Sequence, residues 1–147
     1  AMNDKPELLI TFPGGKRVNA DFFGRVIETD QSPRAGGDGS APEPFALFLA
    51  SIGTCAGIYV LGFLQSRGLD TEGLQIHQRL DFDPQTHTLR GVELDIELPE
   101  SVPGKYHAAI KRAADMCTVK KVIQAQPDFE IRIGGKSSNM ELALASA

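Results

Sequence analysis

The two cysteines are the residues best suited to chemistry in this chain. Cys55 and Cys117 lack a Cys-x-x-Cys spacing, and the three histidines are scattered without ligand spacing, so we expect no metal site. The amino terminus has no apolar run after its first charges, which predicts a cytoplasmic protein without a signal peptide. In that reducing compartment two thiols are more typical of redox chemistry or of inert buried side chains than of a structural disulfide.

The surroundings of the two thiols differ. Cys55 lies in the middle of an uncharged, apolar run over 45–64, where an unassisted thiol has a raised pKa and is inert. Taken alone, this favours a buried structural cysteine. Cys117 lies where one predicted helix gives way to another, and the positive end of a helix dipole favours the thiolate. Two lysines follow it closely and Asp115 opposes them, so the residues alone predict that Cys117 is the more reactive thiol.

The composition describes one modest globular domain. The 147 residues are 41% hydrophobic, enough to bury a core in a single domain spanning 1–147. Acidic residues outnumber basic ones by 19 to 15, which gives a formal net charge of −4. This charge repels nucleic acid and anionic lipid, so we expect neither as a partner.

The elements before Cys55 begin with strands. Alternating apolar residues predict strands over 8–12, 17–22 and 25–29, which would form a three-stranded antiparallel meander. The segment 31–44 is rich in glycine and proline. It is predicted to be a loop, and its length indicates a function.

The run over 45–64 predicts a long helix that is apolar on every face. Its length meets the requirement for a membrane span, but no basic cluster or aromatic belt flanks it, and we expect no membrane insertion. A helix of this kind must otherwise be buried on all sides, and a partner subunit would supply part of the cover. Gly53 and Gly57 form a small-residue stripe that either receives another helix or fits a crowded core within the chain.

After the long helix the apolar period changes to two. Alternation predicts a long hairpin over 74–98, a helix from 104 that is interrupted near Cys117, and a last strand over 129–133. Because strands and helices come in separate runs, the predicted fold class is α+β.

Three segments of the chain resemble the OsmC/Ohr family. They read Ala-Pro-Glu-Pro at 41–44, Gly-Thr-Cys-Ala-Gly at 53–57 and Ala-Asp-Met-Cys-Thr-Val-Lys-Lys-Val-Ile at 114–123. The resemblance covers nearly the whole chain in element order. It implies an OsmC-like fold, with antiparallel sheets packed around long central helices in an intertwined homodimer, and an active site at each subunit interface.

The resemblance also implies a thiol chemistry. In family members that act as peroxidases, the helix cysteine attacks an organic hydroperoxide and becomes a sulfenic acid, which the second cysteine captures as a disulfide. Cys55 would then be the peroxidatic thiol and Cys117 the resolving one. A dithiol such as a lipoyl group is the usual reductant, so no cofactor is implied. Family peroxidases also use an arginine of the first hairpin, for which Arg17 is the candidate and Arg25 the reserve.

The chain departs from the family pattern in two places. The glutamate that orients the arginine lies ten residues before the helix cysteine, and here Phe45 occupies that position. Glu43 lies on the other side of Pro44 and could serve only if the chain before the helix folds back. Thr118 follows the second cysteine, where the family often has proline. With these departures the chain resembles the less characterised OsmC-like branch of the family.

Two functions remain open at this point. The first is a thiol-dependent peroxidase for bulky organic hydroperoxides, active in oxidative-stress defence, with Phe45, Phe48 and Tyr59 against the alkyl chain. The second is a non-catalytic dimer that binds a small apolar ligand in the same interface pocket, with the thiols as passive lining. The separation of the two sulfurs distinguishes them, because a resolving pair must approach disulfide distance.

Overall fold

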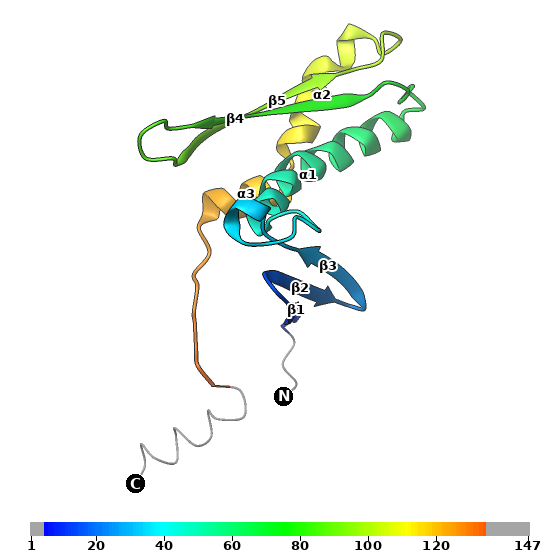
Figure 1. Ribbon diagram of the computed structural model, residues 1–147. Coiled ribbons are helices and arrows are strands. Elements are labelled where there is room, and N and C mark those ends of the chain that lie inside the picture. The colour runs from blue at the N-terminus through cyan, green and yellow to red at the C-terminus, as the bar shows by residue number, and fades with distance from the viewer. Residues whose placement is uncertain (1–4, 135–147) are drawn as a thin grey trace.

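A computed structural model describes residues 5–134 of the chain. A small antiparallel sheet comes first, then one long helix, a two-stranded hairpin and two shorter helices. Figure 1 shows the hairpin on one side of the long helix and the next helix running across the direction of the long helix, while the first sheet lies near the beginning of the long helix. The predicted α+β class is confirmed.

The first sheet is the predicted meander. It consists of β1 (Leu9–Gly14), β2 (Arg17–Phe22) and β3 (Arg25–Thr29), antiparallel and in the order β1-β2-β3. Between β2 and β3 the turn residues Phe23 and Gly24 have φ values of 51° and 77°. Two successive positive φ values are typical of the tight hairpin turns that match strand twist.

A buried carboxylate organises the loop between the sheet and the long helix. Asp30 is only 1% exposed, and four hydrogen bonds to its oxygens lower the pKa of this carboxyl to about 2. The loop also contains a short 3-10 helix, η1 (Pro33–Ala35). The donors to Asp30 are the Ser40 hydroxyl at 2.7 Å and the backbone N–H groups of Ser40 at 3.0 Å, Gln31 at 2.7 Å and Asp38 at 3.2 Å.

The long helix α1 spans Pro44–Ser66, which confirms the helix predicted over 45–64. Proline suits the first position of a helix, because its fixed φ is helical and its missing N–H would have no partner there. The chain leaves the helix through Gly68, whose φ of 62° is left-handed and favours glycine.

Only one stripe of α1 is buried within the chain. It consists of Ile52, Ala56, Val60 and Leu64, which are four residues apart and therefore share a face. The opposite side stays open, and Ile58 is 61% exposed there. By length and composition α1 could cross a membrane, but the core helix of a soluble protein passes the same test. The need for cover from a partner subunit therefore stays a prediction.

The hairpin consists of β4 (Gln75–Phe82) and β5 (Leu89–Glu97), which pair antiparallel, as the alternation over 74–98 predicted. One face carries ion pairs, among them Arg79 with Glu93 at 2.8 Å. The other face carries apolar residues such as Ile96, which packs against the hydrophobic core.

Two short helices follow the hairpin, and the first of them contributes to the core. After a 3-10 turn, η2 (Gly104–Tyr106), come α2 (His107–Asp115) and α3 (Thr118–Ala125), so the predicted interruption near Cys117 is confirmed. The core lies where α1 meets α2 and the segment after the hairpin. Its buried members are Val60, Leu64, Val102 and Ile110.

The last strand predicted from the sequence is wrong for the isolated chain. The segment 126–134 is not in a strand, and Figure 1 shows the chain after α3 extending away from the other elements. Phe129, Ile131 and Ile133 are 90%, 94% and 86% exposed. Their alternation has the period of a strand, but no strand within residues 5–134 pairs with them, and a strand needs a neighbour to bond its backbone.

Candidate functional site

The thiol pair is brought together where α1 meets the start of α3. Cys55 lies in the middle of α1, and Cys117 is the residue that caps the amino end of α3. The Cys117 sulfur accepts a hydrogen bond from the backbone N–H of Lys120 at 3.3 Å and donates one to the carbonyl of Ile52 at 3.8 Å. Both cysteines are free thiols, Cys117 buried and Cys55 partly exposed.

Donors at the start of α3 lower the pKa of Cys55 from its ordinary value. The backbone N–H of Val119 has the largest effect, the Cys117 thiol and the backbone N–H of Thr118 add to it, and burial opposes them. Hydrogen bonds to the charged form of a group favour ionisation. Cys55 therefore gains thiolate character on a helix whose apolar surroundings would otherwise keep it inert.

The amino end of α3 thus acts on the thiol of a neighbouring helix. Sequence reasoning assigned the helix end and the following lysines to Cys117. In the structure, Lys120 pairs with Asp115 at 2.7 Å, which lowers the pKa of the Asp115 carboxyl. The charge of this lysine is therefore matched by a carboxylate on the preceding helix. The N–H groups that reach Cys55 are the feature that residue types alone did not reveal.

The predicted arginine and glutamate have other partners. Arg17 pairs with Asp38 at 3.0 Å and donates from Nε to the Ser40 hydroxyl at 3.3 Å. Glu43 accepts a hydrogen bond from the backbone N–H of Ser32 at 3.1 Å. The carboxylate on Arg17 is therefore that of Asp38, which sequence reasoning missed. Among the described residues, no arginine contributes to the pKa shift of Cys55.

The aromatic residues proposed to bind substrate divide into two places. Phe45 and Phe48 stack with ring centroids 5.8 Å apart and are 51% and 41% exposed. Tyr59 lies one turn beyond Cys55, and its hydroxyl hydrogen-bonds the hydroxyl of Thr118 at 3.2 Å. Tyr59 thus contacts the start of α3, while the two phenylalanines lie near the beginning of α1.

Two adjoining hollows lie beside this junction. The smaller, about 240 Å³, includes Cys117 in its wall. The larger, about 420 Å³, includes Phe48 and Ile123. Both are bordered by Ile52, Val92, Leu94 and Lys120. Basic residues also line them, Arg90 and Lys120 in the larger hollow and Lys111 and Lys120 in the smaller. An apolar wall with cations at its edge suits an alkyl group that carries a polar end.

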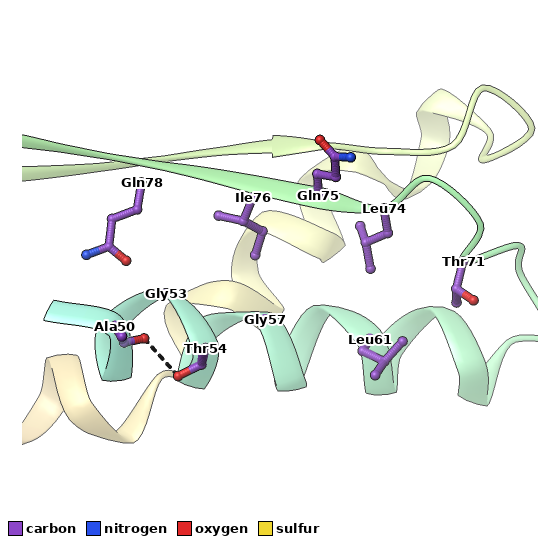
Figure 2. Close-up of a pocket in the computed structure, with 10 residues that line it drawn as sticks. All are labelled: Ala50, Gly53, Thr54, Gly57, Leu61, Thr71, Leu74, Gln75, Ile76 and Gln78. Atoms are coloured by element: carbon purple, nitrogen blue, oxygen red, sulfur yellow. Dashed lines mark hydrogen bonds between the residues drawn. The ribbon is translucent and has the colours of Figure 1, made fainter. Parts of the chain in front are cut away.

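A third hollow, the α1–β4 groove, lies on another side of the long helix. It has a volume of about 570 Å³, and Figure 2 shows the Gln78 side chain directed at α1 across it. Gln78 donates to the carbonyl of Leu49 at 2.8 Å. The groove is lined by Ala50, Gly53, Thr54, Gly57, Leu61, Thr71, Leu74, Gln75, Ile76 and Gln78.

The described part of the chain contains no cluster of side chains that could bind a metal ion. Within residues 5–134, no group of three or more histidine, cysteine, aspartate or glutamate side chains could hold an ion.

Comparison with known proteins identifies the family. The profile of the OsmC-like protein family matches residues 37–132, while no curated protein sequence matches the chain. A Psychrobacter arcticus protein named for osmotic stress and detoxification has a TM-score of 0.67 at 19% identity, over 82% of this chain and 89% of that chain. An OsmC-like protein of Mycoplasma pneumoniae has a TM-score of 0.65 at 14% identity, over 85% and 91%.

A third solved structure is the organic hydroperoxide resistance protein OsmC of Legionella pneumophila. Its TM-score is 0.53 at 18% identity, over 80% of this chain and 89% of that chain. At such identities the three structures establish a common fold. The family profile covers well over half of the sequence, including both cysteines, and the chain belongs to the OsmC-like protein family.

Proposed function

We propose that the protein is a thiol-dependent peroxidase that reduces organic hydroperoxides through Cys55 and Cys117 in defence against oxidative stress. The observation that carries the proposal is the lowered pKa of Cys55, which receives N–H donors from Thr118 and Val119 beside the Cys117 thiol. A thiolate is the nucleophilic form of cysteine. Family membership and the name of the Legionella pneumophila relative support a general role in stress or redox chemistry.

The proposed reaction is a two-electron exchange. The Cys55 thiolate attacks the terminal oxygen of the hydroperoxide, the O–O bond breaks, and the alkoxide leaves and takes up a proton as an alcohol. The Cys117 sulfur then attacks the Cys55 sulfenic acid, which forms a disulfide and releases water. A dithiol, for which a lipoyl group is one source, reduces this disulfide and restores both thiols. The cycle needs no metal or flavin.

The order of the two thiols follows from access. Cys117 is 2% exposed, and its sulfur is already engaged with Lys120 and Ile52. Cys55 is more accessible and receives the donors, so it meets the peroxide first. Phe48 in the neighbouring hollow and Phe45 stacked on it would contact the alkyl chain.

The proposed functional unit is a cytoplasmic homodimer. One side of α1 is uncovered, and Ile131 in the strand-like segment after α3 is 94% exposed. A second copy of the chain would cover the apolar side of α1 and provide a neighbouring strand for this segment. We expect an interface well above about 2,000 Å². In this dimer Arg17, held by Asp38, would lie within about 4–6 Å of a Cys55 thiolate as its counter-charge. Sedimentation at micromolar concentration should show a dimer, and a folded monomer would contradict this part of the proposal.

The second candidate function is that of a non-catalytic dimer that binds a small apolar ligand. The observation that favours it is the pair of mostly apolar hollows beside the junction of α1 and α3, one of which includes Cys117 in its wall. In this case both cysteines would be passive, and mutation of either would leave ligand binding unchanged.

Peroxide consumption by single-cysteine variants separates the two functions. With excess organic hydroperoxide and no reductant, Cys117→Ser should consume one equivalent and stop at a sulfenic acid, whereas Cys55→Ser should consume almost none. In the unmodified protein, mass spectrometry should find a disulfide between the two residues of one chain. Sulfenic acid on Cys117 in the Cys55→Ser protein would reverse the assignment. If neither thiol is oxidised, the ligand-binding dimer is the better account.

A further inference from the structure

Tyr59 is one of the residues that hold the start of α3 against the rest of the chain, beside the buried Cys117 that caps this helix. None of the residues of α3 is buried. Val119 is half-buried, and Val122 and Ile123 are 49% and 43% exposed. Packing alone therefore holds this helix weakly. The hydroxyl of Tyr59 bonds the hydroxyl of Thr118 at 3.2 Å, and Thr118 is the first residue of the helix.

The position of Tyr59 on α1 links this contact to the thiol. Residues four apart on a helix lie on the same face, one turn from each other, so Tyr59 and Cys55 meet the same end of α3. The hydroxyl bond thus fixes the residue whose backbone N–H, together with that of Val119, lowers the pKa of the Cys55 thiol.

We propose that Tyr59 is a positioning residue for Cys55 and acts through Thr118. The two hydroxyls hold the first turn of α3 against α1, so that the backbone N–H groups of Thr118 and Val119 remain directed at the Cys55 sulfur. This inference deepens the proposed peroxidase function, because it names what keeps the attacking thiol reactive. Its test requires neither peroxide nor turnover.

The charged residues near Cys117 do not take part in positioning the donors to Cys55. Lys120 and Asp115, the charged residues on either side of the capping cysteine, pair with each other at 2.7 Å, and neither contributes to the pKa shift of Cys55. Within the described residues, the titratable group that acts on Cys55 is the Cys117 thiol. This thiol is held by the backbone N–H of Lys120, which belongs to the same turn of α3.

Thr118 allows a substitution that removes the donor and keeps the helix. Proline is well accepted at the first position of a helix, and it has neither a backbone N–H nor a hydroxyl. The preceding Cys117 has φ −46° and ψ 114°, an extended ψ close to that which a following proline favours. Thr118→Pro therefore removes one N–H donor and the bond to Tyr59 together.

The experiment measures the pH dependence of iodoacetamide alkylation, with Cys55 and Cys117 read separately by mass spectrometry. Tyr59→Phe and Thr118→Val each remove the hydroxyl bond and should raise the Cys55 midpoint by about half a pH unit. The double variant should shift it no further, since both changes remove one interaction. Thr118→Ser retains the hydroxyl and should keep the midpoint of the unmodified protein. Thr118→Pro should give the largest rise, roughly one unit.

The outcomes separate a positioning role from a merely structural one. An unchanged Cys55 midpoint in Tyr59→Phe, or additive shifts in the double variant, would overturn the inference. So would a shift in Thr118→Ser equal to that in Thr118→Val. Urea unfolding of each variant identifies any that is misfolded, and the conservative Tyr59→Phe then carries the test. Failure of the protein to consume hydroperoxide would refute the proposed function and leave this measurement intact.

Discussion

The contact between Gly53 and Gln78 predicts that two glycines on the same side of α1 respond oppositely to alanine. Both line the α1–β4 groove in Figure 2. A Cβ on Gly53 would lie far inside van der Waals contact with Oε1 of Gln78, whereas a Cβ on Gly57 would lie 3.7 Å from Cδ1 of Ile76, an ordinary contact distance. The two positions therefore differ in what a methyl group meets.

The expected energies follow from the same geometry. Alanine in a helix interior is more stable than glycine by about 0.5–1 kcal/mol, and Gly57→Ala should gain this amount. Gly53→Ala gains it as well, but the Gln78 side chain must move and lose its bond to the Leu49 carbonyl, now 2.8 Å. A part-buried amide without a partner costs about 1–3 kcal/mol. Gly53→Ala should therefore be less stable than Gly57→Ala by about 2 kcal/mol.

Urea unfolding at one fixed protein concentration measures this difference. With a typical slope, about 2 kcal/mol separates the two midpoints by about 1 M urea. The double variant Gly53→Ala/Gln78→Ala removes the side chain that the new methyl group meets, and it should recover most of the loss. Equal midpoints for Gly53→Ala and Gly57→Ala would refute the reasoning, as would a double variant less stable than Gly53→Ala alone.

Three further predictions concern the loop, the projecting segment and the hollow near the thiols. The pKa of Asp30 is lowered from 3.8 to about 2 in the folded protein, so its contribution to the free energy of unfolding is present above pH 3.8 and is lost as the pH falls through about 2. Asp30→Asn should therefore reduce the loss of stability at acid pH, measured by urea unfolding at several pH values. An unchanged pH dependence would contradict this role of Asp30. Ile131→Lys should shift sedimentation toward monomer, because Ile131, 94% exposed in one chain, is expected to be covered by the partner; an unaltered dimer would place the interface elsewhere. Phe48→Ala should raise KM severalfold for a bulky alkyl hydroperoxide and leave hydrogen peroxide kinetics unchanged, and equal effects on both substrates would remove Phe48 from the binding site.

Local patterns in the sequence predicted most of the fold. The meander, the long helix and the hairpin each have a period and end signals contained within their own segments, so 45–64 and 74–98 were predicted close to the observed bounds. The prediction of a strand over 129–133 was wrong because it depends on more than the pattern within the segment. A period of two marks a segment suited to a sheet, but it does not say which chain provides the neighbouring strand.

The loop shows why the residues around Arg17 could not be predicted. Sequence reasoning sought a glutamate near the helix start, whereas the structure supplies Asp38, a residue in a glycine-rich segment with no period to place it. Its position depends on Asp30, which gathers the backbone N–H groups of Asp38 and Ser40. Such a network forms by closure of an irregular loop, and residue types alone do not determine which carboxylate is buried and which is free to pair.

The order of reactivity of the two thiols illustrates the same limit. The residues alone favoured Cys117, because the helix that follows it offers a positive end. The structure adds that a helix end has several N–H groups and that their directions differ. The N–H of Lys120 turns back to the capping Cys117 sulfur at 3.3 Å, while those of Thr118 and Val119 act on Cys55. One helix start therefore acts on both sulfurs and lowers the pKa of the more exposed one, which supports the proposal that Cys55 is the nucleophile.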